Sequence, residues 1–247
     1  MKILVCISKT PDTTAKIAFT DNNTKFAGDD IQWIINPYDE WYALGKAISI
    51  KEKEPETLIH LAHVGLSAGD PIIRKALALG GDEAIRIDCD PSDSWETALQ
   101  LAALAKSEKY DLILTGRETI DYNNAAVGPI IAEILDLHFA ANATHLNIEQ
   151  SIAQVTREVD GGFLTEKVML PLVVGCQKGM AEPRIPNMRG IMGARTKTIR
   201  VINPIDFESR SAYISFQSVP PKSGVKLIPA DNPAELVRLL REEAKVL

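Results

Sequence analysis

A polar loop at residues 116–127 carries the residue types most suited to binding an anion. A short apolar run at 112–114 leads directly into the loop, and a helical pattern that includes Gly128 and Ile130 follows. A helix N-terminus offers unpaired backbone N–H groups and the positive end of a dipole to a phosphate. A mononucleotide would suit this arrangement, and a well-capped loop without a ligand is an equally open interpretation. The loop residues are Gly116, Arg117, Glu118, Thr119, Ile120, Asp121, Tyr122, Asn123, Asn124, Ala125, Ala126 and Val127.

Three further segments are expected near this loop, because ligands bind beyond the carboxyl ends of the strands in an open parallel sheet. These segments are residues 6–9, 36–39 and 64–70.

The common enzymatic motifs are absent from the sequence. No G-x-G-x-x-G follows a strand, and there is no G-x-x-x-x-G-K-[ST], no G-x-S-x-G and no H-E-x-x-H. The three cysteines and four histidines are scattered without the spacing of a metal site. We therefore expect a binding or carrier protein with no catalytic residue and no metal.

Strands and helices that would position these loops alternate over the first 140 residues or so. The expected strands are residues 3–7, 58–64 and 112–114, which are apolar runs typical of buried parallel strands. The expected helices run from 37 past 50, from 71 to 79, from 92 to about 106, and from about 124 to 135. This alternation predicts an α/β fold with a doubly wound parallel sheet.

Helix starts are marked by three predicted caps. Asn36 precedes Pro37, and Asp70 precedes Pro71, so each pair places a side-chain acceptor before a proline at the first helical position. Asp93, followed by Glu96, has the spacing of a capping box.

The pattern changes after His138. Short segments at 146–148, 152–159 and 163–168 predict an antiparallel β section, with a hairpin turn at 160–162. Residues 182–193 are loop-like and display apolar side chains, and the two interpretations, burial in the core or contact with a partner, are both open.

An extended arm is predicted at residues 203–231, followed by a final helix whose start is marked by Asn232, Pro233 and Glu235. We divide the chain into a nucleotide-binding α/β domain at 1–202 and an arm with its helix at 203–247. The arm is expected to dock on this domain or on another chain.

Composition narrows the class of protein. The chain has 247 residues with 45% hydrophobic residues and a net charge of −6, which suits a folded domain and opposes binding to nucleic acid. No apolar stretch approaches the roughly 20 residues of a membrane-spanning helix. We expect the reducing cytoplasm of a bacterium, or the mitochondrial matrix if the source is eukaryotic, and no insertion into a membrane.

Taken together, the segments resemble the beta (small) subunit of electron transfer flavoprotein. The resemblance covers nearly the whole chain, and the order and spacing of its motifs make it specific. The matching motifs are KILVCISKTPD, INPYDEWYAL, KALALGGDEAIRI, DLILTGRETIDYNNAAVG, VTREVDGG, LPLVV and EPRIPNMRGIMGARTK.

The resemblance implies a heterodimer in which an alpha subunit holds most of the site for a redox-active FAD, while this chain binds a structural AMP. Besides the loop at 116–127, the family's AMP-binding positions correspond to Cys6, Asn36, Pro37, Tyr38, Asp39 and Val64.

The resemblance also implies partners. Met188 falls where the family has a leucine that anchors acyl-CoA dehydrogenases, and Arg157 and Glu158 would lie near the alpha-subunit interface. The arm and helix at 203–247 would wrap and dock on the alpha subunit. The flavin of the partner would pass electrons to a membrane quinone oxidoreductase (ETF-quinone oxidoreductase).

Two alternatives stay open. The apolar residues 125–127 are similar to the branch of the family whose beta subunit binds a second FAD in place of AMP and bifurcates electrons from NADH. A stand-alone nucleotide-binding protein of the stress type would have a similar fold and no need for a partner.

Overall fold

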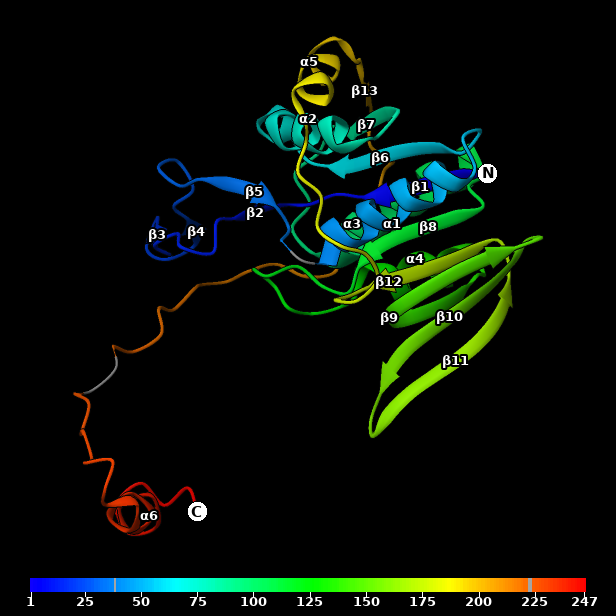
Figure 1. The fold of residues 1–247 in the computed structure, drawn as a ribbon. Coiled ribbons are helices and arrows are strands. Elements are labelled where there is room, and N and C mark those ends of the chain that lie inside the picture. Colours follow the sequence, from blue (N-terminus) through cyan, green and yellow to red (C-terminus); the bar gives the residue numbers. More distant parts are fainter. Residues whose placement is uncertain (38, 222–223) are drawn as a thin grey trace.

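A mixed nine-stranded sheet organises the computed structural model, which describes residues 1–37, 39–221 and 224–247 (Figure 1). The strand order is β11-β10-β9-β12-β8-β1-β6-β7-β13. Seven of these strands run parallel to one another, and β10 and β11 extend the sheet beyond β9 as an antiparallel hairpin. The expected α/β fold with an added antiparallel section is confirmed. The parallel strands are β1 (Lys2–Cys6), β6 (Leu58–Val64), β7 (Glu83–Ile87), β8 (Leu112–Gly116), β9 (His138–Glu149), β12 (Leu172–Cys176) and β13 (Ile199–Ile202), and the hairpin strands are β10 (Ile152–Val159) and β11 (Gly162–Met169).

Helices cover both faces of the parallel strands. One hydrophobic core joins the sheet to α1 (Asp39–Lys53) and α2 (Asp70–Leu79). A second core joins the opposite face to α3 (Ser94–Glu108) and α4 (Val127–Leu135). Successive residues of β1 alternate between the two cores, which explains why the buried strands read as continuous apolar runs.

One of the three predicted caps is confirmed. The Asp93 carboxylate accepts a 2.8 Å hydrogen bond from the backbone N–H of Glu96 at the start of α3. The prediction for Asp70 is wrong, because this residue lies inside α2, after a short 3-10 turn at Ser67–Gly69, and its carboxylate pairs with Arg86 at 2.9 Å.

The predicted cap at Asn36 is also wrong, since α1 begins three residues later, at Asp39, and Pro37 precedes the helix. The Asn36 side chain is used instead to hold another part of the chain, as described below.

A helix occupies part of the segment predicted to be a loop at 182–193. Helix α5 (Met188–Thr196) begins after Asn187, whose side chain accepts a 2.8 Å hydrogen bond from the N–H of Gly190. A Cβ atom at Gly190 would lie 2.3 Å from the carbonyl oxygen of Ala78 on α2. The glycine that lowers helix propensity is therefore the residue that lets α5 pack closely on α2.

Asn187→Ala should loosen α5 without changing the sheet. We expect a loss of about 1 kcal/mol in the local stability of α5, because an N-cap side chain is removed. Amide hydrogen exchange checks this: protection at 190–196 should fall, while protection of the strands stays constant. Unchanged exchange in α5 would contradict the prediction.

Smaller elements lie outside the main sheet. Strand β2 (Lys9–Pro11) pairs with β5 (Trp33–Ile35), and β3 (Phe19–Thr20) pairs with β4 (Lys25–Phe26). The sequence patterns do not predict these four strands, nor β7, β12 and β13, each of which has at most five residues.

The predicted arm and final helix are confirmed. Apart from residues 222–223, the segment 203–231 has no helix or strand, and α6 (Pro233–Glu242) begins after Asn232, whose side chain accepts a 3.3 Å bond from the N–H of Glu235. Figure 1 shows the arm leaving the sheet and ending at α6, well apart from it. The boundary at 203 between two domains stays a prediction. Within the described residues, none of the helices has the length and apolar character that a membrane crossing needs.

Candidate functional site

The direction of winding reverses between β1 and β8. From β1 the chain proceeds to β6 and β7 on one side, and then to β8 on the other side of β1. In open α/β sheets, ligands bind at such a switch point, outside the carboxyl ends of the strands. The carboxyl ends of β1 and β8 are Cys6 and Gly116, so the predicted loop at 116–127 starts at this position.

The Asn36 side chain fixes the first part of the loop 116–127. This side chain is fully buried and donates a 2.9 Å hydrogen bond to the carbonyl oxygen of Glu118. Its side-chain oxygen accepts a 3.0 Å bond from the N–H of Ile120. The amide thus pairs one acceptor and one donor of the loop backbone, which fixes residues 118–120 against the start of α1.

Asp39 and Arg117 form the charged part of the site. The Asp39 carboxylate lies 3.6 Å from the Arg117 guanidinium and accepts a 3.4 Å bond from the N–H of Glu118. Burial raises the pKa of the Asp39 carboxyl, and Arg117 opposes this rise. Arg117 also pairs with the Glu118 carboxylate at 2.5 Å, so its charge is largely balanced within the loop.

Glu40 is the site residue that sequence reasoning missed. Its carboxylate accepts a 2.6 Å bond from the N–H of Ser8 and a 2.5 Å bond from the Ser8 hydroxyl. The residue is 4% exposed, and burial, with repulsion from Asp121 and Asp39, raises its pKa to about 8. An acidic residue in the first turn of a helix is ordinarily explained by the helix dipole, so the sequence alone gives no sign of this burial.

Gly116 allows β8 and α1 to approach closely. A Cβ atom there would lie 3.0 Å from the Cβ of Asp39 and 3.1 Å from the Cγ of Glu40. The absence of a side chain therefore brings the loop against the two carboxylates.

The second half of the loop is exposed and ends at an uncapped helix. Asn123 and Ala125 adopt left-handed backbone conformations, with φ of 48° and 50°, so α4 begins at Val127 and not at the expected position near 124. Asn124 donates a 2.6 Å bond to the Ser94 hydroxyl at the start of α3. The cap residue Ala126 makes no side-chain hydrogen bond of its own. Its N–H donates to the Asn124 side chain at 3.4 Å, and Pro129 has no N–H, so an acceptor from outside would have the N–H groups of Val127 and Gly128.

The remaining predicted ligand residues are placed differently. Cys6 is buried in the core on the α3 side, which raises the pKa of its thiol well above the usual range, and Val64 packs beside this core at the end of β6. Pro37 is half-buried just before α1. Tyr38 lies outside the described residues.

The predicted partner-binding residues lie at two ends of the sheet. Met188 is exposed on α5, which packs on α2 beside β6 and β7. Arg157 and Glu158 lie on the hairpin at the other end, where Arg157 pairs with Glu166 at 3.0 Å and Glu158 accepts a 2.6 Å bond from Gln177.

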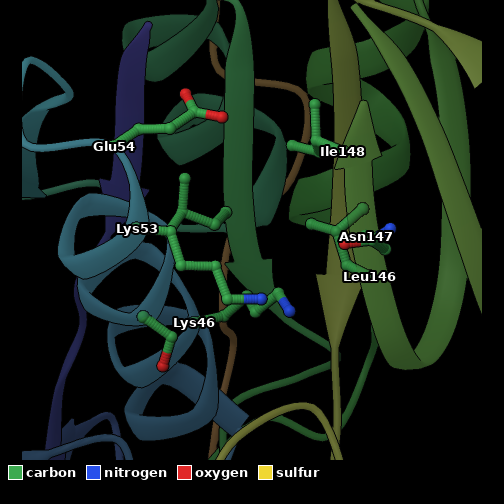
Figure 2. Close-up of a pocket in the computed structure, with 8 residues that line it drawn as sticks. Lys46, Lys53, Glu54, Leu146, Asn147 and Ile148 are labelled. Carbon is green, nitrogen blue, oxygen red and sulfur yellow. The ribbon is translucent and has the colours of Figure 1, made fainter. Parts of the chain in front are cut away.

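A separate groove lies between α1 and β9. A narrow cavity of about 40 Å³ adjoins a wider one of about 340 Å³, and both are lined by Lys46, Leu146 and Asn147. Figure 2 shows Lys46 and Lys53 of α1 reaching toward the strand that carries Leu146 and Ile148. Burial, followed by repulsion from Lys53, lowers the pKa of Lys46. This groove is distinct from the loop at 116–127, and sequence analysis had not indicated it.

Throughout the part of the chain that the structure describes, no three His, Cys, Asp or Glu side chains gather as a metal site.

The parallel sheet, its switch point and the loops that meet there define a doubly wound α/β domain of the ligand-binding type. The model of the electron transfer flavoprotein domain family matches residues 24–206. The chain is 36% identical to the electron transfer flavoprotein subunit beta of Bacillus subtilis, over the whole of both chains. It is 30% identical to the human subunit beta, over 100% of this chain and 99% of that one. The chain belongs to the electron transfer flavoprotein beta-subunit family, a family of electron-carrier subunits, which confirms the resemblance.

One relative is named as a subunit of a larger complex. The chain is 32% identical to subunit CarD of the caffeyl-CoA reductase-Etf complex of Acetobacterium woodii, over 83% of this chain and 79% of that one.

Proposed function

We propose that this chain is the beta subunit of a heterodimeric electron transfer flavoprotein and binds a structural AMP at the loop 116–127. The observation that carries the proposal is the convergence of Asn36 and Asp39 on this loop at the switch point of the sheet. The FAD that relays electrons would be held mainly by the alpha subunit. This chain then acts as a scaffold and a docking surface and performs no chemistry on a substrate.

The donors and acceptors of the site suit the two ends of a mononucleotide. The N–H groups of Val127 and Gly128 at the start of α4 would hold the phosphate. Asp39 and Asp121 lie close enough to Glu40 to raise its pKa, and the carboxylates of these two aspartates accept hydrogen bonds from hydroxyl or amino groups. The acidic end therefore suits the nucleoside and repels a phosphate.

A second candidate function is electron bifurcation with a second FAD in this subunit and oxidation of NADH. It is favoured by the apolar side chains of Ala125, Ala126 and Val127 at the start of α4 and by the similarity to a subunit of the caffeyl-CoA reductase-Etf complex. A stand-alone stress-type protein is disfavoured by the match to beta subunits over the full chain.

Further partners follow from the proposed role. We infer that α5 docks acyl-CoA dehydrogenases through Met188, that Arg157 and Glu158 lie near the alpha subunit, and that electrons pass to ETF-quinone oxidoreductase. The exposed Met188 and Met192 side chains on α5 support the first of these proposals, because large exposed apolar side chains frequently mark interaction surfaces.

Met188→Asp should weaken docking of an acyl-CoA dehydrogenase by about tenfold or more, because it places a charge in an apolar contact. The matched control is Met169→Asp on β11, since Met188 and Met169 are 71% and 74% exposed. Surface plasmon resonance with an immobilised dehydrogenase measures both. Equal effects of the two substitutions would contradict a specific role for α5.

The proposed function is tested by the nucleotide content of the complex. We would coexpress this chain with its alpha subunit, denature the purified complex, and quantify FAD and AMP by chromatography. One FAD and one AMP per heterodimer supports the electron carrier, whereas two FAD and no AMP supports the bifurcating alternative. A chain that copurifies with no alpha subunit and no flavin would overturn both.

A further inference from the structure

The first part of the C-terminal arm is attached to the domain before the arm runs free. The backbone N–H and carbonyl of Ile205 form two 2.9 Å hydrogen bonds with the side chain of Gln100 on α3. Gln100 is buried, so these bonds fix the base of the arm on α3.

The arm then crosses the start of α3. The Arg210 guanidinium lies 4.1 Å from the ring centre of Trp95, which is a cation–π contact. The Ser211 hydroxyl donates a hydrogen bond to Asp93, the N-cap of α3. This crossing brings the arm to the helix end that Asn124 of the candidate loop also contacts through Ser94.

Two aromatic residues of the arm, Tyr213 and Phe216, contact the loop 116–127 and strand β3. Tyr213 stacks on Tyr122, with ring centres 5.8 Å apart and an angle of 28° between the rings. Phe216 stacks on Tyr213 at 5.4 Å and on Phe19 of β3 at 5.0 Å. The N–H of Phe216 also donates a 2.7 Å bond to the carbonyl oxygen of Asn23. The loop at 116–127 and the β3–β4 hairpin are therefore connected by the arm.

We propose that residues 205–216 form a strap that holds the loop 116–127 closed, with Tyr213 as the positioning residue. Asn36 fixes the loop at 118–120 and Asn124 ties it to α3, so the exposed Tyr122 lies between these anchors and is held by the ring of Tyr213. The strap would slow the exchange of a nucleotide bound under the loop. This inference rests on the proposed function.

The arm also connects the strap to the C-terminal helix α6. The arm continues from Phe216 to α6, whose Leu236 and Val237 side chains are exposed. A partner bound to α6 would therefore be connected through the arm to the segment that covers the loop.

The test is nucleotide exchange in the coexpressed heterodimer. Each complex is incubated with isotopically labelled AMP, or with labelled FAD if the composition assay finds FAD, and replacement of the bound nucleotide is followed by mass spectrometry. Tyr213→Ala should exchange about 3- to 10-fold faster than wild type, the factor that corresponds to loss of one stacked aromatic pair. Tyr213→Phe should restore most of the wild-type rate, because it keeps the stacked ring and loses only the hydroxyl, which is hydrogen-bonded to Tyr122.

Ile214→Ala is the matched control, since Ile214 is the next residue of the arm and is 87% exposed. Its exchange rate should equal that of wild type, and the thermal unfolding midpoint should be the same for all variants. Equal exchange in wild type and Tyr213→Ala, or equal acceleration by Ile214→Ala, would overturn the strap and leave the proposed function intact. A wild-type complex that contains no adenine nucleotide would overturn the proposed function, and the strap with it.

Discussion

Asn36→Ala should release the loop 116–127 and empty the site. The carbonyl of Glu118 and the N–H of Ile120 both lose their partner, and each unsatisfied buried group costs about 1–3 kcal/mol. Because the loop can move to water in the free protein, we expect the free energy of unfolding to fall by about 2 kcal/mol. The AMP retained by the purified heterodimer should fall by about tenfold or more.

Urea unfolding and nucleotide content measure the two effects. The matched control is Asn147→Ala, because Asn147 is an exposed asparagine on β9 whose side chain bonds only to Glu149 among the described contacts. The control should change the free energy of unfolding by less than about 0.5 kcal/mol. It should leave the AMP content within error of wild type. If Asn36→Ala lowers stability but keeps full AMP, the nucleotide does not depend on this loop.

Stability should fall as the pH rises toward 8, and Glu40 should be the cause. Folding raises the pKa of this carboxyl from its ordinary value of 4.5 to about 8. Between these pH values the folded state binds a proton that the unfolded state has released, so rising pH favours unfolding. One pKa unit corresponds to about 1.4 kcal/mol, which gives a contribution of about 2 kcal/mol between pH 6 and pH 8.

Glu40→Gln isolates this contribution, since the amide cannot ionise and its oxygen can still accept a bond from Ser8. We would measure urea unfolding of both proteins from pH 5.5 to 8.5 and plot the difference in free energy of unfolding. The wild type should lose stability relative to Glu40→Gln as pH rises. A difference that stays constant over this range would refute the assignment.

Three of the buried strands and most helices could be predicted because each depends on neighbours in the sequence. The apolar runs of β1, β6 and β8 and the cap at Asp93 are local signals, and the structure contains them. The arm and α6 were predictable for the same reason.

Predictions were wrong where a residue distant in the sequence makes a contact that the local pattern does not indicate. Gly190 lowers helix propensity, yet α5 forms because the missing Cβ atom lets the helix pack closely on the carbonyl of Ala78 in α2. Asp70 has a cap-like position, yet it pairs with Arg86 on β7. The spacing of residues along the sequence does not show that Ala78 lies against Gly190, or that Arg86 pairs with Asp70.

The candidate site was predictable as a set of loops and not as a set of contacts. The carboxyl-end rule placed residues 36–39 near 116–127, and Asn36 does contact Glu118 and Ile120. The pairing of Ser8 with Glu40 depends on how β1 and α1 pack in three dimensions, so no pattern in the sequence indicates it.

The contact between Arg210 and Trp95 gives the protein an optical signal of its own. The chain has three tryptophans, and Trp95 is the one that carries a guanidinium of the arm against its ring. Detachment of the arm would expose this indole to water and shift its emission to longer wavelength. With Trp33 and Trp41 replaced by phenylalanine, the intrinsic fluorescence of the complex would report the position of the arm in real time, without an attached dye.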